Sequence, residues 1–226
     1  MKEKIIFALL IIVLVVLVCF IPSKEAVIKE ELLGIDYEVE GNEVDLSYET
    51  DNPVVALYVK NYGSIVMELY PEIAPNTVSN FISLVKKGFY DQNTFHRLMP
   101  GFVLQGGDPD GTGNGGPGYS IKGEFTSNGF ENNLLHEKWV VSMARATAFD
   151  TAGSQFFICL GTATHLDGNY AAFGKVIDGF DNITAIEENE KIADSQNGIL
   201  QNNLTIQKAL VDLQGKEYSE PEIITE

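Results

Sequence analysis

Cysteine, histidine and tryptophan are scarce in this sequence. Its 226 residues include 2 cysteines, 3 histidines and 1 tryptophan. Cys19 and Cys159 cannot build a disulfide framework, because the first lies in an apolar N-terminal run and the second lies far along the chain. The histidines are too scattered to show the spacing of metal ligands, so we predict no metal site and no cofactor.

Basic residues are also few. Lysine and arginine total 15 against 32 acidic residues, which gives a formal net charge of -17. A chain that binds nucleic acid needs a basic face to neutralise phosphates, so nucleic acid is excluded as a partner. We interpret the acidic surface as a solvated face that maintains solubility, and we expect a monomer. The 45% of hydrophobic residues is typical of one globular domain with appendages.

The longest hydrophobic run covers residues 5–21, IIFALLIIVLVVLVCFI, directly after a lysine-containing start. As a helix it would span about 25 Å, so residues 1–23 are predicted to be a membrane segment or a signal peptide. An uncleaved signal anchor is favoured, because no small residues follow at a cleavage position. Lipidation of Cys19 and plain cleavage remain alternatives. Lys2 and Lys4 favour a cytoplasmic N-terminus, which puts the rest of the chain at the cell membrane on the extracytoplasmic side.

The remaining chain divides by composition. Residues 24–53 carry 10 acidic residues against two lysines and are interpreted as an acidic linker, although alternation at residues 35–39 would also suit a short strand. Residues 54–214 form the predicted folded domain. Residues 215–226, with four glutamates and Pro221, are predicted to be an acidic tail.

Short period-two runs separated by glycine-containing turns predict a mainly β domain. The expected strands cover residues 54–60, 64–70, 95–98, 102–106, 139–143, 155–160, 171–177 and 203–210. Residues 75–87, with Pro75 suited to a first helical turn, and residues 179–188 are predicted helices. Eight strands and two helices predict a closed eight-stranded antiparallel barrel capped by the helices and preceded by the N-terminal apolar helix.

Two segments place polar side chains among apolar neighbours: FHRLMPGFVLQGGD at residues 95–108 and WVVSMARATAFDTAGSQFFICLG at residues 139–161. By themselves these segments also allow an interpretation without a functional site, in which Arg97 is a surface ion-pair partner and Gln105 is a residue at a strand end. The glycine-rich stretch 106–118 has neither the Gly-Lys-Ser/Thr ending of a phosphate loop nor the glutamate of an EF-hand, so its glycines are interpreted as turn residues.

Together with HLDGNYAAFGKVIDG at residues 165–179, these segments resemble, in the same order, the cyclophilin family of peptidyl-prolyl cis-trans isomerases. The resemblance covers about residues 54–212 and implies an eight-stranded barrel. It implies that Arg97 of the FHR motif is the catalytic residue. It further implies binding of proline-containing polypeptides by His96, Phe102, Val103, Gln105, Ala144, Arg145, Gln155, Phe157, Leu166 and Tyr170.

At four positions in these segments, this chain departs from the family pattern. Val103 replaces a common methionine and Tyr170 replaces a histidine, and both substitutions are compatible with an apolar proline pocket. Arg145 replaces an asparagine, and the resemblance implies that this position contacts substrate mainly through its backbone. His165 stands where cyclosporin-sensitive members have tryptophan, so we predict weak cyclosporin binding.

Three hypotheses follow. The first is a membrane-anchored, bacterial-like isomerase that acts on X-Pro bonds during extracytoplasmic protein folding. The second is a module or folding scaffold that binds proline segments with little turnover. The third gives the function to the linker and the tail, as docking segments for another protein.

Overall fold

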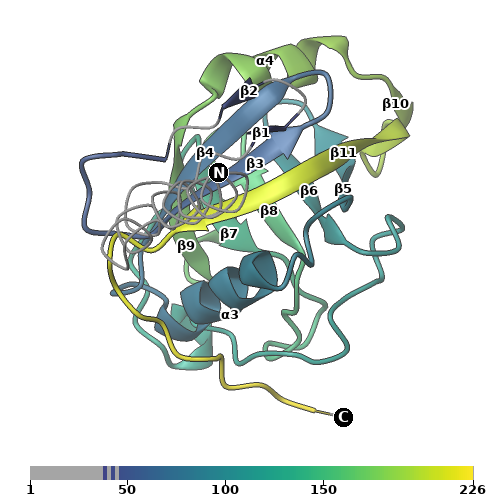
Figure 1. The fold of residues 1–226 in the computed structure, drawn as a ribbon. Helices are drawn as coiled ribbons and strands as arrows, with labels where there is room; N and C mark the ends of the chain where they lie inside the picture. The colour runs from purple at the N-terminus through teal and green to yellow at the C-terminus, as the bar shows by residue number, and fades with distance from the viewer. Residues whose placement is uncertain (1–37, 40–41, 44–45, 226) are drawn as a thin grey trace, which may run out of the picture. The chain divides into compact units, whose positions relative to one another are not determined.

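The computed structural model describes residues 38–39, 42–43 and 46–225 of the chain (Figure 1). The hydrophobic run 5–21, the predicted N-terminal helix and Cys19 lie outside these residues. Among the described residues, no helix is long and apolar enough to cross a membrane.

Nine strands form one antiparallel sheet that closes on itself (Figure 1). They are β3 (Val54–Val59), β4 (Gly63–Leu69), β5 (Thr94–Met99), β6 (Val103–Asp108), β7 (Val140–Met143), β8 (Phe156–Cys159), β9 (Ala172–Asp178), β10 (Ile192–Asp194) and β11 (Ile199–Asp212). The strand order is β10-β11-β3-β4-β9-β7-β8-β6-β5, and β11 also pairs with β5. That last pairing closes an eight-stranded barrel, and β10 is a short addition paired with β11.

The predicted barrel is therefore confirmed, and each of the eight expected strands has a counterpart. Two short strands were not predicted, β10 and β2 (Asn42–Glu43). β2 pairs with β1 (Glu38–Val39), which lies within residues 35–39, where a short strand was an alternative to the linker. β11 begins four residues earlier than expected, at Ile199 rather than 203, because its first residues pair with β10 and Ile199 also pairs with Arg97 on β5.

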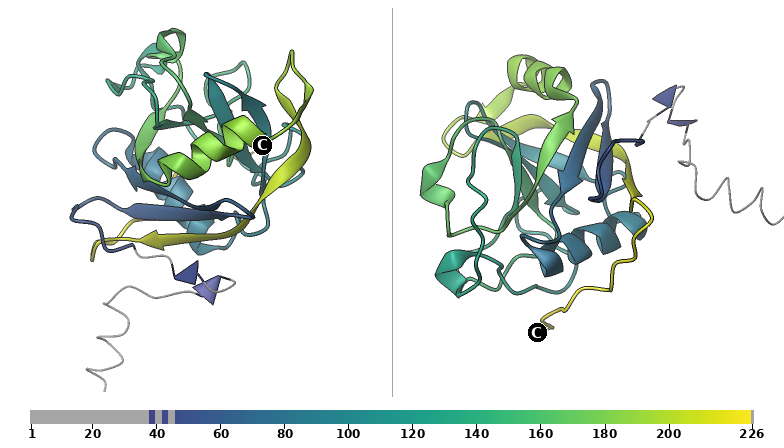
Figure 2. Two further views of the ribbon diagram at one scale, coloured as in Figure 1. Left: turned by 90° about the horizontal axis from the view of Figure 1, so that it is seen from above. Right: turned by 90° about the vertical axis from the view of Figure 1, so that its left-hand side faces the viewer.

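Two helices, α3 (Pro75–Lys86) and α4 (Phe180–Asn189), lie at opposite ends of the barrel (Figures 1 and 2). Pro75 occupies the first turn of α3 as predicted, but Ala74 before it provides no side-chain cap. The carboxylate of Glu124 accepts hydrogen bonds from the backbone N–H groups of Asn76 at 3.0 Å and Thr77 at 2.7 Å instead. A distant residue thus caps the helix.

Aromatic side chains fill the barrel interior below α3. The ring of Phe81 on this helix lies 4.9 Å from Tyr90, 5.3 Å from Phe156 and 5.1 Å from Phe173, measured between ring centroids. All four side chains are fully buried. The interior is therefore a packed core with no room for a ligand, and a binding site has to lie on the outer surface of the barrel.

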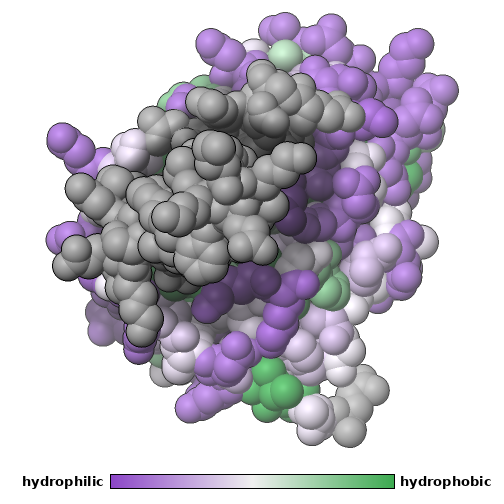
Figure 3. Space-filling view, viewed as in Figure 1, coloured by the Kyte–Doolittle hydropathy of each residue, from purple (hydrophilic) through white to green (hydrophobic). Residues whose placement is uncertain are grey.

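Parts of the acidic linker and of the acidic tail contact the barrel. Leu46 and Tyr48 pack against an apolar patch on β3 and β4, and Asn52 donates a hydrogen bond to the Glu68 carboxylate at 3.1 Å. In the tail, the backbone of Ile224 pairs with Ser120. Away from such contacts the visible surface of the described part is largely hydrophilic, in keeping with the acidic composition (Figure 3).

Candidate active site

Strand β5 carries Arg97, which is half-buried at the outer surface of the barrel. In the sheet Arg97 pairs with Gln105 on β6 and with Ile199 on β11. Its Nε donates to the backbone carbonyl of Asn197 at 2.8 Å, its Nη1 donates to Oε1 of Gln105 at 3.1 Å, and its Nη2 contacts the sulfur of Met99. Three contacts thus fix the plane of the guanidinium. Burial lowers the pKa of Arg97, but an arginine remains cationic at neutral pH.

Two glutamines extend this hydrogen-bond chain. Nε2 of Gln105 donates to Oε1 of Gln155 at 3.0 Å, and Nε2 of Gln155 donates to the carbonyls of Gly113 at 3.0 Å and Gly115 at 2.9 Å. The chain connects Arg97 with the glycine-rich loop. Both glutamines were predicted as site residues, and the structure brings them together beside Arg97.

The glycine-rich loop folds around one carboxylate. Asp108 accepts hydrogen bonds from the backbone N–H groups of Asp110 and Thr112, at 2.8 and 2.9 Å, and also from Gly113. Burial raises the pKa of Asp108, but these backbone donors outweigh it and lower the pKa below its ordinary value. Within the described residues, no three His, Cys, Asp or Glu side chains form a group that could hold a metal ion.

An apolar cluster separate from the barrel core adjoins Arg97, and we call it the apolar pocket. Its buried members are Val103, Phe157, Cys159, Ala163 and Leu166, and its partly buried members are Met99, Phe102, Ala144 and Tyr170. Six of these nine were predicted from the sequence. Met99 and Cys159 were missed, although both stand two positions along a strand from a predicted residue and so share its face. No sequence signal marked Ala163.

Next to the apolar pocket lies a depression of about 690 Å³. Its lining includes residues 113–120 together with Gln105, Gln155, Ala144 and Arg145. The surface therefore offers a fixed cation, an apolar pocket and an adjoining polar depression. This combination suits an extended peptide with one apolar side chain inserted in the pocket.

The family model for cyclophilin type peptidyl-prolyl cis-trans isomerase/CLD matches residues 54–211. The chain belongs to the cyclophilin family. Peptidyl-prolyl cis-trans isomerase B of Bacillus subtilis is 54% identical over 119 residues, which cover 53% of this chain and 80% of that protein. The peptidyl-prolyl cis-trans isomerase of Helicobacter pylori is 49% identical over 116 residues, 51% of this chain and 68% of that protein.

A solved structure supports the same conclusion. The cyclophilin type isomerase of Cryptosporidium parvum, crystallised in the presence of the dipeptide Ala-Pro, superposes with a TM-score of 0.62 at 32% identity. The match covers 70% of this chain and 98% of that one. The predicted enzyme class, a cyclophilin-type peptidyl-prolyl cis-trans isomerase, is thereby confirmed.

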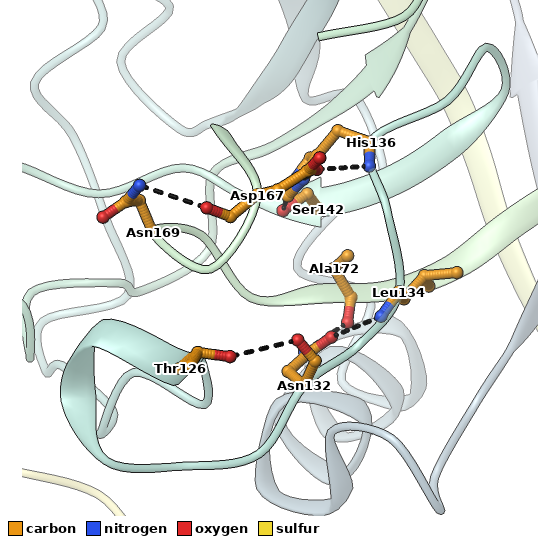
Figure 4. Close-up of polar contacts among 8 residues, drawn as sticks. All are labelled: Thr126, Asn132, Leu134, His136, Ser142, Asp167, Asn169 and Ala172. Carbon is orange, nitrogen blue, oxygen red and sulfur yellow. Dashed lines mark hydrogen bonds and ion pairs between the residues drawn. The ribbon is translucent and has the colours of Figure 1, made fainter. Parts of the chain in front are cut away.

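A polar cluster of His136, Asp167 and Ser142 packs against Phe157 of the apolar pocket in this cyclophilin, and Figure 4 shows the hydrogen bonds of the cluster. Nδ1 of His136 lies 3.0 Å from Oδ1 of Asp167, and Nε2 lies 3.0 Å from Oγ of Ser142. The His136 ring stacks on Phe157 with centroids 6.0 Å apart. Although these three groups match a Ser-His-Asp set, Ser142 is fully buried and no substrate can reach it. His136 was given no role from the sequence, because its partners Asp167 and Ser142 carry no spacing signal.

Arg145 uses its side chain to organise a loop. Its guanidinium donates to the backbone carbonyls of Asn169, Ala146 and Thr147 at distances between 2.9 and 3.0 Å. The same group lies 4.6 Å from the centroid of the Tyr170 ring. Arg145 therefore holds one wall of the apolar pocket in place, and its predicted contact with substrate stays a prediction.

Two histidines flank the site in different environments. His96, predicted to bind substrate, is only 2% exposed, which leaves almost none of its surface for a substrate. Neither ring nitrogen of His96 has a hydrogen-bond partner among the described residues. His165 is exposed and stacks on Phe102 with centroids 5.4 Å apart. The weak cyclosporin binding predicted from His165 stays a prediction.

Proposed function

We propose that Arg97 is the catalytic residue of this isomerase and that the apolar pocket holds the substrate proline. The observation that carries the proposal is a cation held by three contacts at the rim of an apolar pocket. The Ala-Pro dipeptide named with the Cryptosporidium parvum relative adds support, since that relative has the same fold.

The chemistry follows from the X-Pro bond. Rotation about an amide costs roughly 18 to 20 kcal/mol because conjugation is lost at the transition state. The prolyl nitrogen then carries a localised lone pair, and a fixed N–H donor that meets this lone pair stabilises the transition state more than the ground state. No covalent bond breaks, so the site needs no nucleophile. An arginine has five N–H donors, and the contacts of Arg97 leave at least two of them for a substrate.

The apolar pocket supplies the other requirement, which is to hold the ring while the preceding carbonyl rotates. Phe157 and Leu166 are 5% and 8% exposed, so a proline ring would rest on surfaces already largely removed from water. The T-shaped contact of Phe157 with Tyr170, with centroids 5.9 Å apart, fixes the angle of one wall. In our proposal, Gln105 and Gln155 bind the substrate backbone where it passes from the pocket to the adjoining depression.

The test is an isomerisation assay with a proline-containing peptide on the full chain and on Arg97→Ala and Arg97→Lys. Both variants are expected to lose about 100-fold or more in kcat, as when a transition-state donor is removed elsewhere, with native circular dichroism. Lys60→Ala, at an exposed turn cation, is the control and is expected to keep full activity. Equal rates for Arg97→Ala and the parent would overturn the role of Arg97. A parent that binds the peptide without turnover would favour the binding module.

We also propose that residues 1–23 anchor this cyclophilin in the cell membrane, with the isomerase domain on the extracytoplasmic side, where it acts on folding proteins. The hydrophobic run 5–21 and the preceding Lys2 and Lys4 support this placement. Protease added to intact cells is expected to remove the domain. If the domain is protected from the protease as well as a cytoplasmic marker is, the placement is contradicted. The mass of the mature N-terminus distinguishes an uncleaved anchor, a lipid at Cys19 and plain cleavage.

A further inference from the structure

We propose that the turn Asp194–Gly198, between β10 and β11, is a positioning element that sets the orientation of the Arg97 guanidinium. The inference rests on the proposed catalytic role of Arg97. None of the residues of this turn belongs to the apolar pocket or lines the adjoining depression. Its effect on the reaction therefore passes through Arg97.

Two hydrogen bonds from neighbouring residues dock the turn on β5. The carbonyl of Asn197 accepts from Nε of Arg97 at 2.8 Å, and the carbonyl of Gly198 accepts from the backbone N–H of Leu98 at 2.8 Å. The second bond fixes the turn against the strand that carries Arg97. The first bond holds Nε of Arg97 in place and so restricts rotation of the guanidinium that carries the two Nη groups.

The Asp194 carboxylate holds Asn197 in place. Oδ1 accepts from the backbone N–H of Gln196 at 2.9 Å and of Asn197 at 3.3 Å, and Oδ2 accepts from Nδ2 of Asn197 at 2.8 Å. The Asp194 carbonyl also accepts from the N–H of Gly198 at 2.7 Å. Asn197 is thus bound through both its backbone and its side chain. The side-chain bond from Asn197, with the backbone donors, lowers the pKa of Asp194, so the carboxylate is charged at neutral pH.

Gly198 permits the close approach. Its φ of +73° is a conformation that favours glycine, and a Cβ there would lie 2.7 Å from the Leu98 carbonyl oxygen and 2.5 Å from Cγ of Met99. A larger residue would push the turn away from β5 and lengthen the Asn197–Arg97 hydrogen bond. Both ends of the turn, Asp194 and Gly198, are therefore built to present the Asn197 carbonyl to Arg97.

If the turn orients Arg97, its loss should lower kcat and leave KM nearly unchanged. A guanidinium released at Nε keeps its charge but spends less time with its free N–H groups directed at the prolyl nitrogen, so the transition state loses stabilisation. The apolar pocket is unchanged, so the ground-state affinity for the peptide is kept. A merely structural role would lower the active fraction without changing the Arg97 environment.

The experiment compares Asp194→Ala and Asp194→Asn with the parent in the full chain. The matched control is Asp212→Ala at the other end of β11, where Oδ1 caps a turn by accepting from the N–H of Gln214 at 2.7 Å. We expect Asp194→Ala to lower kcat about ten-fold, the effect of losing one hydrogen bond to a charged group, with KM within about two-fold. Asp194→Asn keeps an acceptor oxygen, so its kcat is expected to lie between that of Asp194→Ala and that of the parent. The NMR signal of the Arg97 Nε–H is expected to shift in both.

Unchanged kcat and an unchanged Nε–H signal in a folded Asp194→Asn variant would overturn the inference, and so would an equal loss in Asp212→Ala. If Asp194→Ala does not fold, Asp194→Asn decides the matter by the same two readouts. The Arg97→Ala variant is measured in parallel. If it keeps the parent rate, the proposed function fails; if it is inactive while the turn variants are fully active, only the positioning role fails.

Discussion

At the residue scale, His96 and His136 are two buried histidines near the site. Burial lowers the pKa of both imidazoles, and nearby Asp108 and Asp167 oppose this without reversing it. In His136 the neutral ring can accept at one nitrogen and donate at the other, which suits its place between Ser142 and Asp167. The neutral form is therefore the one that the folded chain stabilises.

These shifts predict how stability depends on pH. The unfolded chain keeps histidines with a pKa near 6.5, so below about pH 6.5 it binds more protons than the folded chain. The contribution of both residues is complete above about pH 6.5 and is lost as the pH falls toward their lowered values. Urea unfolding at pH 7.5, 6.0 and 5.0 is expected to show decreasing stability. An imidazole NMR titration that placed the His136 pKa above 6.5 would contradict this prediction.

Cys159 shows how burial decides reactivity at a single residue. Its thiol belongs to the apolar pocket, and burial raises the pKa to about 12. Since the thiolate is the reactive form, this cysteine is inert in the folded chain. Its place in the pocket is that of a small apolar side chain.

At the scale of elements, the acidic tail forms a strap along helix α3. Asn76 at the start of the helix exchanges two hydrogen bonds with the Glu222 backbone, at 2.7 and 3.0 Å. Near the helix end, Glu220 accepts from Ser83 and Lys87, both at 2.8 Å. The strap ends where Ile224 pairs with Ser120. The tail thus ties α3 to the loop that lines the depression.

Removal of residues 216–226 is expected to destabilise the chain. The Asn76 side chain makes two hydrogen bonds with the Glu222 backbone, and Ile224 makes two backbone hydrogen bonds with Ser120. At a net contribution of about 1 kcal/mol each, we expect a loss of about 4 kcal/mol and a lower Tm. Differential scanning calorimetry measures this loss. Glu220→Gln is the comparison, and its Tm is expected to stay near that of the parent because Lys87 and Glu220 are exposed. A truncated chain with the parent Tm would show that the strap adds no stability.

At the scale of the whole molecule, closure of the barrel makes unfolding cooperative. β11, the last long strand, pairs with both β3 and β5 and so closes the ring of strands. One aromatic core spans α3, β5, β8 and β9. No part of this ring can separate without exposing core side chains to water.

Trp139 offers a measurement of this cooperativity. It precedes β7, and its ring lies 5.2 Å from Phe180 at the start of α4, so its emission reports on the contact between barrel and helix. We expect the fluorescence transition in urea to coincide with the transition by far-UV circular dichroism. Transitions at clearly different urea concentrations would show that α4 unfolds separately from the barrel.

The sequence by itself determined the barrel and the enzyme class. Period-two runs gave the eight strands, and Pro75 with its 3,4-spaced apolar residues gave the helix, because both signals are local. The ordered motifs gave the enzyme class and assigned Arg97 and Gln105 to one predicted site. The structure pairs these two residues because β5 and β6 are joined by a short turn.

Only the tertiary structure decided which groups support that site. Asn197 lies 100 residues from Arg97 in the sequence, and it contacts Arg97 through a carbonyl that every residue type carries. Glu124 caps α3 from 47 residues away at Thr77, and Asp167 contacts His136 from 31 residues away. Such contacts depend on chain closure across the barrel, and therefore leave no local pattern of spacing or hydrophobicity in the sequence.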